Sequence, residues 1–133
     1  MFSSKREELL LLARVLLSLV FLFSAYTKLS NMPDAVAYIQ TAGLPAETVL
    51  AWVAAFIELA GGLMLLLGFH AKAAAAGLAV YLLIVSYFFH LNVSDGTQTF
   101  HLLKNLAIMG GLVNLMASGS GRYSLKNCDC CVE

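Results

Sequence analysis

Apolar residues follow one another along the chain in four long stretches. A transmembrane helix needs about 20 mainly apolar residues, because each residue adds about 1.5 Å along the helix axis. The stretches are residues 9–26, 49–69, 71–91 and 100–116. The pattern therefore predicts an all-α membrane protein whose four transmembrane helices form an antiparallel bundle.

The connections between the predicted spans are short, apart from the first. Residues 28–49 hold Pro33, which suits the first turn of a helix, and Gly43, which is placed to end one. We expect a short interfacial helix in this first outer loop. The second connection, at residues 68–72, is a tight turn that makes the second and third spans antiparallel neighbours, and Asp95-Gly96 marks a third turn.

Composition agrees with a membrane protein. Hydrophobic residues make up 60% of the chain and charged residues only 12%, whereas soluble domains have about 25% charged residues. The net charge is zero, and no basic patch indicates binding to nucleic acid.

The distribution of lysine and arginine predicts the orientation. Four spans put both termini on one side, and five basic residues fall there, whereas Lys28 and Lys104 lie towards the other side. The five are Lys5, Arg6, Lys72, Arg122 and Lys126. By the positive-inside rule, both termini are cytoplasmic.

Helical spacing directs Glu58 into the bundle. Its neighbours on the same face of the second span are all small, and small residues let helix backbones approach closely in lipid. These neighbours are Ala54, Ala55, Gly61 and Gly62. Glu58 lies near the middle of its span, where a charged group costs about 2.5 to 3.5 kcal/mol, so it should have a cationic partner.

Each of the other spans also brings polar side chains to one face. We predict that Lys104, about 7 Å from the outer boundary, reaches Glu58. A ligand-binding pocket would then open outwards between Glu58, Lys104 and Asn105, with Lys28, Tyr87, His90 and His101 at its rim and Arg14 nearer the inner side. Cations outnumber acids in this set, which favours an anionic or carbonyl-rich small molecule.

Other interpretations of these polar residues stay open. The buried charges are also typical of a structural network that fixes how the helices pack. Arg14 is alternatively within reach of lipid phosphates. Two histidines, His90 and His101, are too few to define a metal site on their own.

All three cysteines lie in a tail at residues 128–133, which follows the membrane domain of residues 1–127. In the cytosol Cys128, Cys130 and Cys131 would be reduced, and three thiolates close together bind soft ions such as copper(I) or zinc. The alternative is a set of flexible thiols without a defined site, because a second pair of ligands is missing from the pattern.

The chain resembles the DoxX family of small bacterial inner-membrane proteins. The likeness rests on five segments: "ARVLLSLVFLFSAYTKL", "ELAGGLMLLLGF", "HLNVSDG", "KNLAIMGGL" and "GSGRYSL". This resemblance implies a four-helix bundle in the bacterial inner membrane. Some relatives are associated with quinone-linked oxidation, others with complexes that protect against oxidative or thiol stress, and another branch with copper-related peptide modification.

From the resemblance we expect an accessory subunit of a quinone-linked membrane oxidoreductase or of an oxidative-stress or thiol-stress complex. The alternatives are a small transporter or copper-handling membrane protein, and an assembly partner without a ligand. No phosphate loop, nucleophile elbow or paired CxxC motif occurs, so we do not expect catalysis by this chain alone. Expected partners are membrane lipid, oxidoreductase subunits and further copies of this chain.

Overall fold

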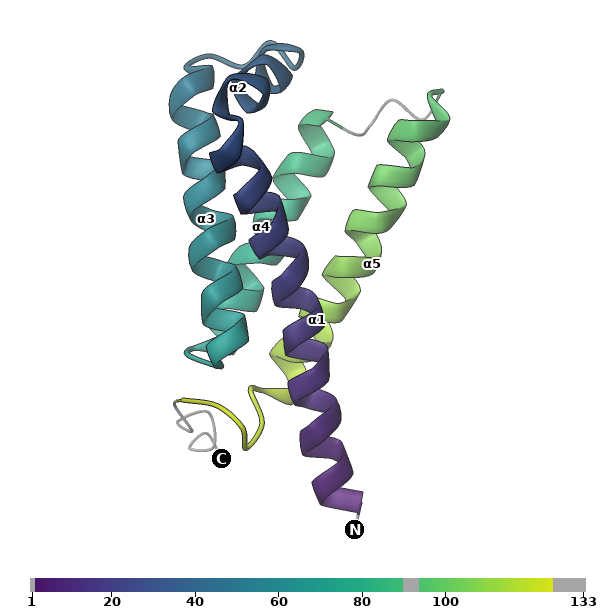
Figure 1. Ribbon diagram of the computed structural model, residues 1–133. Helices are drawn as coiled ribbons and strands as arrows, with labels where there is room; N and C mark the ends of the chain where they lie inside the picture. Colours follow the sequence, from purple (N-terminus) through teal and green to yellow (C-terminus); the bar gives the residue numbers. More distant parts are fainter. Residues whose placement is uncertain (1, 90–93, 126–133) are drawn as a thin grey trace.

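The computed structural model describes residues 2–89 and 94–125 as helices and short connections, without a strand in those ranges. The helices are α1 (Phe2–Ser30), α2 (Met32–Gln40), α3 (Glu47–Leu67), α4 (Ala71–Phe89) and α5 (Gly96–Ser118). Four of them, α1, α3, α4 and α5, are long and apolar enough to cross a membrane. Figure 1 shows these four running up and down the bundle. The predicted all-α, four-span fold is confirmed.

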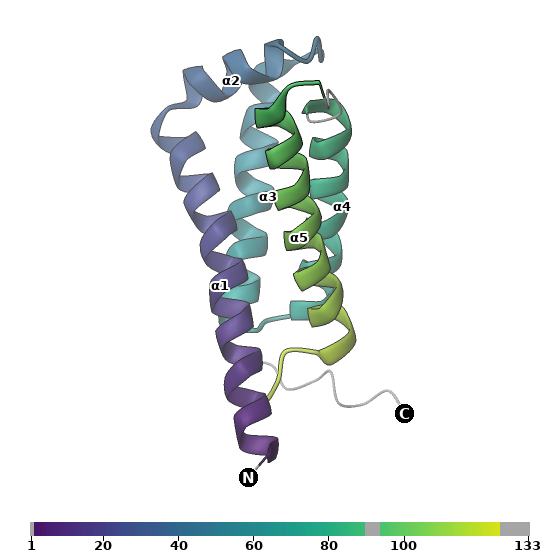
Figure 2. The same cartoon turned by 90° about the vertical axis from the view of Figure 1, so that its right-hand side faces the viewer.

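The short helix α2 lies across one end of the bundle, here called the α2 end (Figure 2). It begins after Asn31, whose side-chain amide donates to Asp34 in the first turn. Ile39 is buried, and the Tyr38 ring stacks on Phe89 with ring centroids 4.9 Å apart. Partial burial raises the pKa of the Tyr38 phenol. The predicted helix in the first connection is therefore present.

The other connections are also built by local signals. Gly68 ends α3 at φ +72°, and the Phe69 amide donates to the Met64 carbonyl, which turns the chain directly into α4. Asp95 precedes α5 and accepts a hydrogen bond from the Thr97 amide at 3.0 Å. The tight turn predicted between the second and third spans is confirmed.

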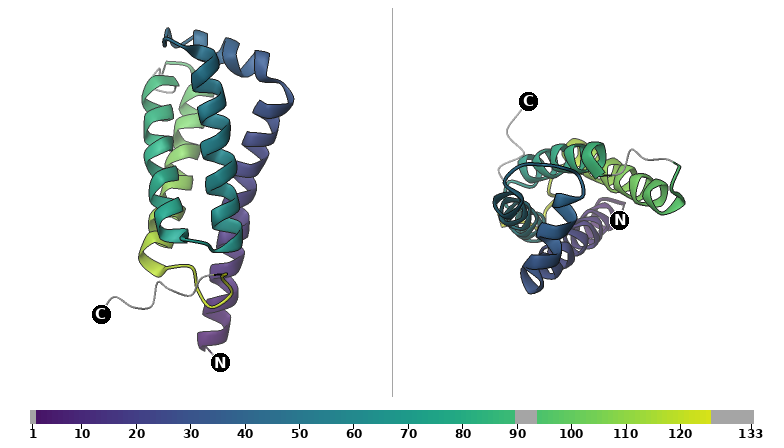
Figure 3. Two further views of the ribbon diagram at one scale, coloured as in Figure 1. Left: turned by 90° about the vertical axis from the view of Figure 1, so that its left-hand side faces the viewer. Right: turned by 90° about the horizontal axis from the view of Figure 1, so that it is seen from above.

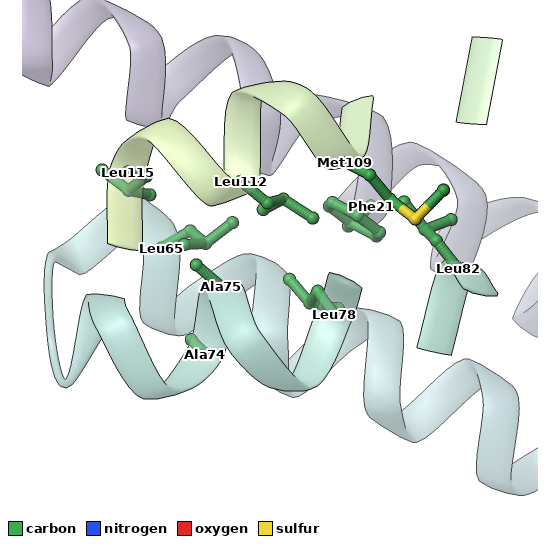
Figure 4. Close-up of a cluster of buried hydrophobic side chains, with 9 residues drawn as sticks. All are labelled: Phe21, Leu65, Ala74, Ala75, Leu78, Leu82, Met109, Leu112 and Leu115. Atoms are coloured by element: carbon green, nitrogen blue, oxygen red, sulfur yellow. The ribbon is translucent and has the colours of Figure 1, made fainter. Parts of the chain in front are cut away.

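A buried apolar cluster joins all four long helices (Figure 4). Close contact depends on glycine: a Cβ atom on Gly61 would lie 2.7 Å from the Leu78 side chain, and one on Gly62 would lie 3.0 Å from Leu22. The predicted small-residue face of α3 therefore packs against both α1 and α4. The cluster consists of Phe21, Leu65, Ala74, Ala75, Leu78, Leu82, Met109, Leu112 and Leu115.

The outer surface of the bundle is apolar, as expected of helices that face lipid. Phe23, Leu83 and Phe100, on three different helices, are each more than half exposed. Helices α1 and α5 approach each other near Leu17 and Gly111, where a Cβ atom on the glycine would lie 3.2 Å from the leucine side chain, and they separate towards α2 (Figure 1, Figure 2). The start of α1 and the segment after α5 share one end of the bundle, here called the terminal end (Figure 3). Which side of the membrane this end faces stays a prediction.

Candidate functional site

Four polar side chains from three helices form a cluster in the half of the bundle nearer α2. We call it the Lys28–Glu58 cluster; its members are Ser24, Lys28, Glu58 and Tyr81. The Lys28 ammonium donates to both Glu58 carboxylate oxygens, at 2.8 and 3.1 Å, and to the Ser24 hydroxyl at 2.8 Å. The Tyr81 hydroxyl donates to Glu58 at 2.7 Å. A single carboxylate thus links α1, α3 and α4.

The direction of the helices explains why Lys28 and Glu58 meet. Side chains on a helix lean towards its N-terminus. Lys28 is near the end of α1, so it leans back into the bundle, whereas Glu58 is at the middle of α3, which runs the opposite way, so it leans up towards the α2 end. The two side chains therefore approach each other although Lys28 lies well above Glu58 along the bundle axis.

The cluster is buried but not sealed. Only 6% of the Glu58 side chain is exposed, compared with 26% of the Lys28 side chain. Among the described residues, every buried side-chain nitrogen and oxygen has a hydrogen-bond partner. Pairing offsets the cost of a carboxylate in the membrane interior, which is about 2.5 to 3.5 kcal/mol for an unpaired charged group.

Lys104 does not have the role that the sequence predicted for it. Its side chain is exposed, and its nitrogen lies 3.5 Å from Nδ1 of His101, one turn earlier in α5. Because α5 begins at the α2 end, Lys104 leans towards that end and away from the level of Glu58. The structure pairs Glu58 with Lys28 and Tyr81 instead, which corrects the predicted Glu58–Lys104 pair.

Asn105 and Tyr87, two further members of the predicted pocket, lie apart from the Lys28–Glu58 cluster. Asn105 is buried and donates to the Ser86 hydroxyl at 3.1 Å, which ties α5 to α4. Tyr87 is 65% exposed and directed away from the core, whereas His101 is partly buried. His90 lies outside the described residues. Of the predicted rim residues that the structure describes, Lys28 alone forms a hydrogen bond with Glu58.

Arg14 forms a second buried polar centre, at the terminal end, and its partners among the described residues are all backbone carbonyls. Its guanidinium donates to Leu65 at 3.0 Å and Leu66 at 3.1 Å, the last turn of α3. It also donates to Ser120 and, at 2.8 Å, to Tyr123 in the segment after α5. We call this arrangement the Arg14 anchor. Because Arg14 is 1% exposed, it is available neither to a lipid phosphate nor to a ligand in the predicted pocket.

Comparison with known proteins identifies the family. The model of the DoxX family matches residues 9–91. Inner membrane protein YqjF of Escherichia coli (strain K12) is 30% identical over 115 residues, which cover 86% of this chain and 87% of the relative. The chain belongs to the DoxX family.

A second relative, inner membrane protein YphA from the same organism, is 26% identical over 129 residues, or 93% of this chain and 92% of the relative. No solved structure matches the chain. All four members of the Lys28–Glu58 cluster lie within the part that matches the DoxX model, whereas Lys104 and Asn105 lie outside it. The cluster therefore belongs to the part of the chain that the family model describes.

The sequence did not identify two members of the Lys28–Glu58 cluster, Ser24 and Tyr81. Ser24 precedes Lys28 by one helical turn, a spacing that places both on one face of α1. Tyr81 lies in the middle of its span, away from the boundaries where tyrosines form the usual aromatic belt. That position was the signal that Tyr81 needs a polar partner inside the bundle.

The predicted metal ligands of the tail lie outside the residues that the structure describes. Cys128, Cys130 and Cys131, and with them the division into a membrane domain and a tail, fall outside the described residues. Within residues 2–89 and 94–125, no group of three or more histidine, cysteine, aspartate or glutamate residues is arranged to hold a metal ion. Copper or zinc binding by the tail stays a prediction.

Proposed function

We propose that this protein is an accessory inner-membrane subunit of a quinone-linked oxidoreductase or of a complex that protects against oxidative or thiol stress. In this proposal the Lys28–Glu58 cluster is where the subunit contacts a quinone head group. The observation that carries the proposal is a hydrogen-bonded ammonium–carboxylate–phenol group inside the bundle, with its ammonium still partly exposed. Intramembrane ionisable groups of this kind are functional candidates by default.

The donors of the cluster fit a ligand that carries carbonyl oxygens. Lys28 has three N–H donors, and one of them goes to the neutral Ser24 hydroxyl, a weaker acceptor than the Glu58 carboxylate. A ligand carbonyl that takes the place of Ser24 would leave the Lys28–Glu58 pair intact. A quinone, when bound, carries electrons and protons between membrane enzymes.

In this proposal Glu58 is the group that accepts and releases a proton. Its Oε1 already accepts hydrogen bonds from Lys28 and Tyr81, so a proton delivered to the carboxylate would meet two polar side chains that can rearrange around it. The Tyr81 hydroxyl can accept as well as donate, which lets it stay bonded to a protonated Glu58. Lys28 lies near the end of α1 and is partly exposed, so a ligand dissolved in the membrane would reach the cluster at this residue.

Quinone binding by the purified protein tests the proposal. We expect full-length protein in mild detergent to bind ubiquinone or menaquinone in native mass spectrometry. Lys28→Met, Glu58→Gln and Tyr81→Phe should each lower the affinity at least about tenfold, because each removes one member of the hydrogen-bonded group. Co-purification from bacterial membranes with a membrane oxidoreductase should accompany binding.

Lys104→Met is the matched control, because it removes a lysine charge near the same end of the bundle without touching Glu58. Quinone affinity should stay within about twofold of the parent protein. An equal loss of quinone affinity in Lys104→Met and Lys28→Met would contradict binding at the Lys28–Glu58 cluster and would indicate that Lys104 is part of the site. Parent protein that binds neither quinone would overturn the proposal and favour an assembly partner without a ligand.

We also infer that both termini face the cytoplasm. Lys5, Arg6 and Lys72 lie at the terminal end, and Arg122 follows α5 at that same end, as the positive-inside rule requires of a cytoplasmic side. Fusions after Glu133 test this: green fluorescent protein should fluoresce, and alkaline phosphatase should be inactive. Active phosphatase would reverse the orientation.

A further inference from the structure

A polar cleft opens at the terminal end, far from the Lys28–Glu58 cluster. Its volume is about 490 Å³, and its walls come from the start of α1, the start of α4 and the segment after α5. Three basic residues line it, Arg6, Lys72 and Arg122, and the acidic residue among the lining is Glu7. The cleft therefore has an excess of positive charge.

The one lining carboxylate is already engaged. Glu7 pairs with the Arg6 guanidinium at 3.2 Å, and its other oxygen accepts the backbone amide of Arg122. Among the described residues, no carboxylate lies within 4.0 Å of the side-chain nitrogens of Lys72 or Arg122. Within the part of the chain that the structure describes, both cations therefore lack an acidic partner and can meet an anion that enters the cleft.

Two glycines shape the wall beside Lys72 and Glu7. Gly119 and Gly121 have φ values of +79° and +74°, which favour glycine. A Cβ atom on Gly119 would lie 3.3 Å from Cε of Lys72, and one on Gly121 would lie 2.9 Å from a Glu7 carboxylate oxygen. The lack of side chains here lets the backbone pass close to both charged groups and keeps the cleft open.

An apolar groove continues from this cleft along the bundle. It has a volume of about 470 Å³ and shares Arg6 and Ser118 with the cleft. Its further lining on α1 is Lys5 and the apolar residues Leu9, Leu10 and Ala13. Asn114 of α5 closes its other side. The groove thus runs from a basic cleft onto helix surface that is apolar enough to lie in the membrane.

We propose that the cleft and groove together bind an anionic phospholipid. The phosphate would lie between Lys72 and Arg122, and one acyl chain would lie along Leu9, Leu10 and Ala13. Basic pockets between transmembrane helices recognise anionic lipid head groups in this way. The adjoining groove is what favours a lipid over a soluble phosphate ester, which has nothing to place against apolar side chains.

Native mass spectrometry of the full-length protein with phosphatidylglycerol or phosphatidylcholine tests the proposal. We expect the parent protein to bind phosphatidylglycerol more tightly, and the double variant Lys72→Gln/Arg122→Gln to lose about 30-fold in affinity, since each basic group near a membrane surface contributes about fivefold. Glu7→Gln should tighten binding, because it removes a negative charge and keeps an acceptor for the Arg122 amide. Lys104→Gln, a charge removed at the other end of the bundle, should change affinity less than twofold.

Ala13→Phe tests the groove separately from the charges. The larger side chain should lower phosphatidylglycerol affinity at least about fivefold, while the melting temperature of the protein stays within a few degrees. Glycerol 3-phosphate should bind far more weakly than the lipid. Equal affinity for the two phosphatidyl lipids, an equal loss from Lys104→Gln, or glycerol 3-phosphate that binds as tightly as phosphatidylglycerol would each overturn the proposal.

Discussion

Arg14 and Lys28 lie on the same face of α1 by helical spacing, yet the structure uses the two cations in opposite ways. Arg14, at the terminal end, donates to four backbone carbonyls and, within residues 2–89 and 94–125, contacts no carboxylate. Lys28, at the α2 end, pairs with the Glu58 carboxylate and one hydroxyl. Two residues of equal charge on one helix therefore stabilise different kinds of contact.

The partners decide which of the two centres can take part in function. Carbonyls at the end of α3 and after α5 are fixed by the backbone, so the Arg14 guanidinium cannot exchange them without moving whole segments. A serine hydroxyl and a carboxylate can rotate, and Lys28 is partly exposed to whatever lies beside α1. The Arg14 anchor is a structural joint, whereas the Lys28–Glu58 cluster has the freedom that a binding site needs.

Removal of the Arg14 side chain should have the largest effect on stability. Arg14→Met leaves several carbonyls without a donor, and hydrogen bonds to charged groups contribute about 1.5 to 3 kcal/mol each, so we expect a loss of at least about 3 kcal/mol. Arg14→Lys should recover little, because an ammonium cannot reproduce the planar fork. Thermal unfolding in detergent measures both, and full recovery by lysine would show that charge alone is sufficient.

Lys28→Met should destabilise the protein less than Arg14→Met. It leaves Glu58 with Tyr81 as its remaining partner, and we expect a loss of about 2 kcal/mol, below the 3 to 5 kcal/mol of a fully buried pair because Lys28 is partly exposed. The double variant Lys28→Met/Glu58→Gln should lose less stability than the two single variants lose in sum. Additive losses in the same unfolding assay would mean that the two side chains do not interact.

Gly68→Ala should disturb the Arg14 anchor and leave the other cluster intact. The residue has φ +72°, and its Cβ atom would lie 2.5 Å from the Cβ of Ser124 and 2.9 Å from the Arg14 guanidinium carbon. We expect a loss of about 1 to 2 kcal/mol. Gly110→Ala is the control, since nothing lies within 4 Å of its Cβ position, and it should be neutral or slightly stabilising. Quinone affinity should not change in either variant.

The sequence predicted the spans and the inward face of α3 because both depend on periodic, local properties. Apolar length defines a span, and the small residues around Glu58 define a contact face. Both predictions needed only spacing along one helix.

The partners of the charged groups depended on information that spacing does not hold. Lys104 and Asn105 are adjacent, so they differ by about 100° around α5, and only packing decides which of them turns inwards. Asn105 does, and Lys104 faces outwards. The partners of Arg14 are carbonyl groups, which every residue carries, so no residue type identified them. Orientation of neighbouring helices was needed to recognise Lys28 as the partner of Glu58.

The smallest expected effect on stability comes from Ser24→Ala, which tests whether the Lys28 ammonium can exchange a partner, as the Arg14 guanidinium cannot. Ser24→Ala removes one acceptor from Lys28 within α1 and should cost about 0.5 kcal/mol, the lower end of the range for a hydrogen bond inside a protein, because Lys28 is partly exposed. If a ligand carbonyl replaces Ser24 at the ammonium, quinone affinity should stay the same or rise, because the ligand no longer competes with the hydroxyl. Ser18→Ala is the matched control and should leave affinity unchanged. The Ser18 hydroxyl donates to the backbone carbonyl of Val15, one turn earlier in α1. A fall in affinity from Ser24→Ala would instead make the serine part of the ligand contact, and the Lys28 ammonium would then be held in place rather than exchanged.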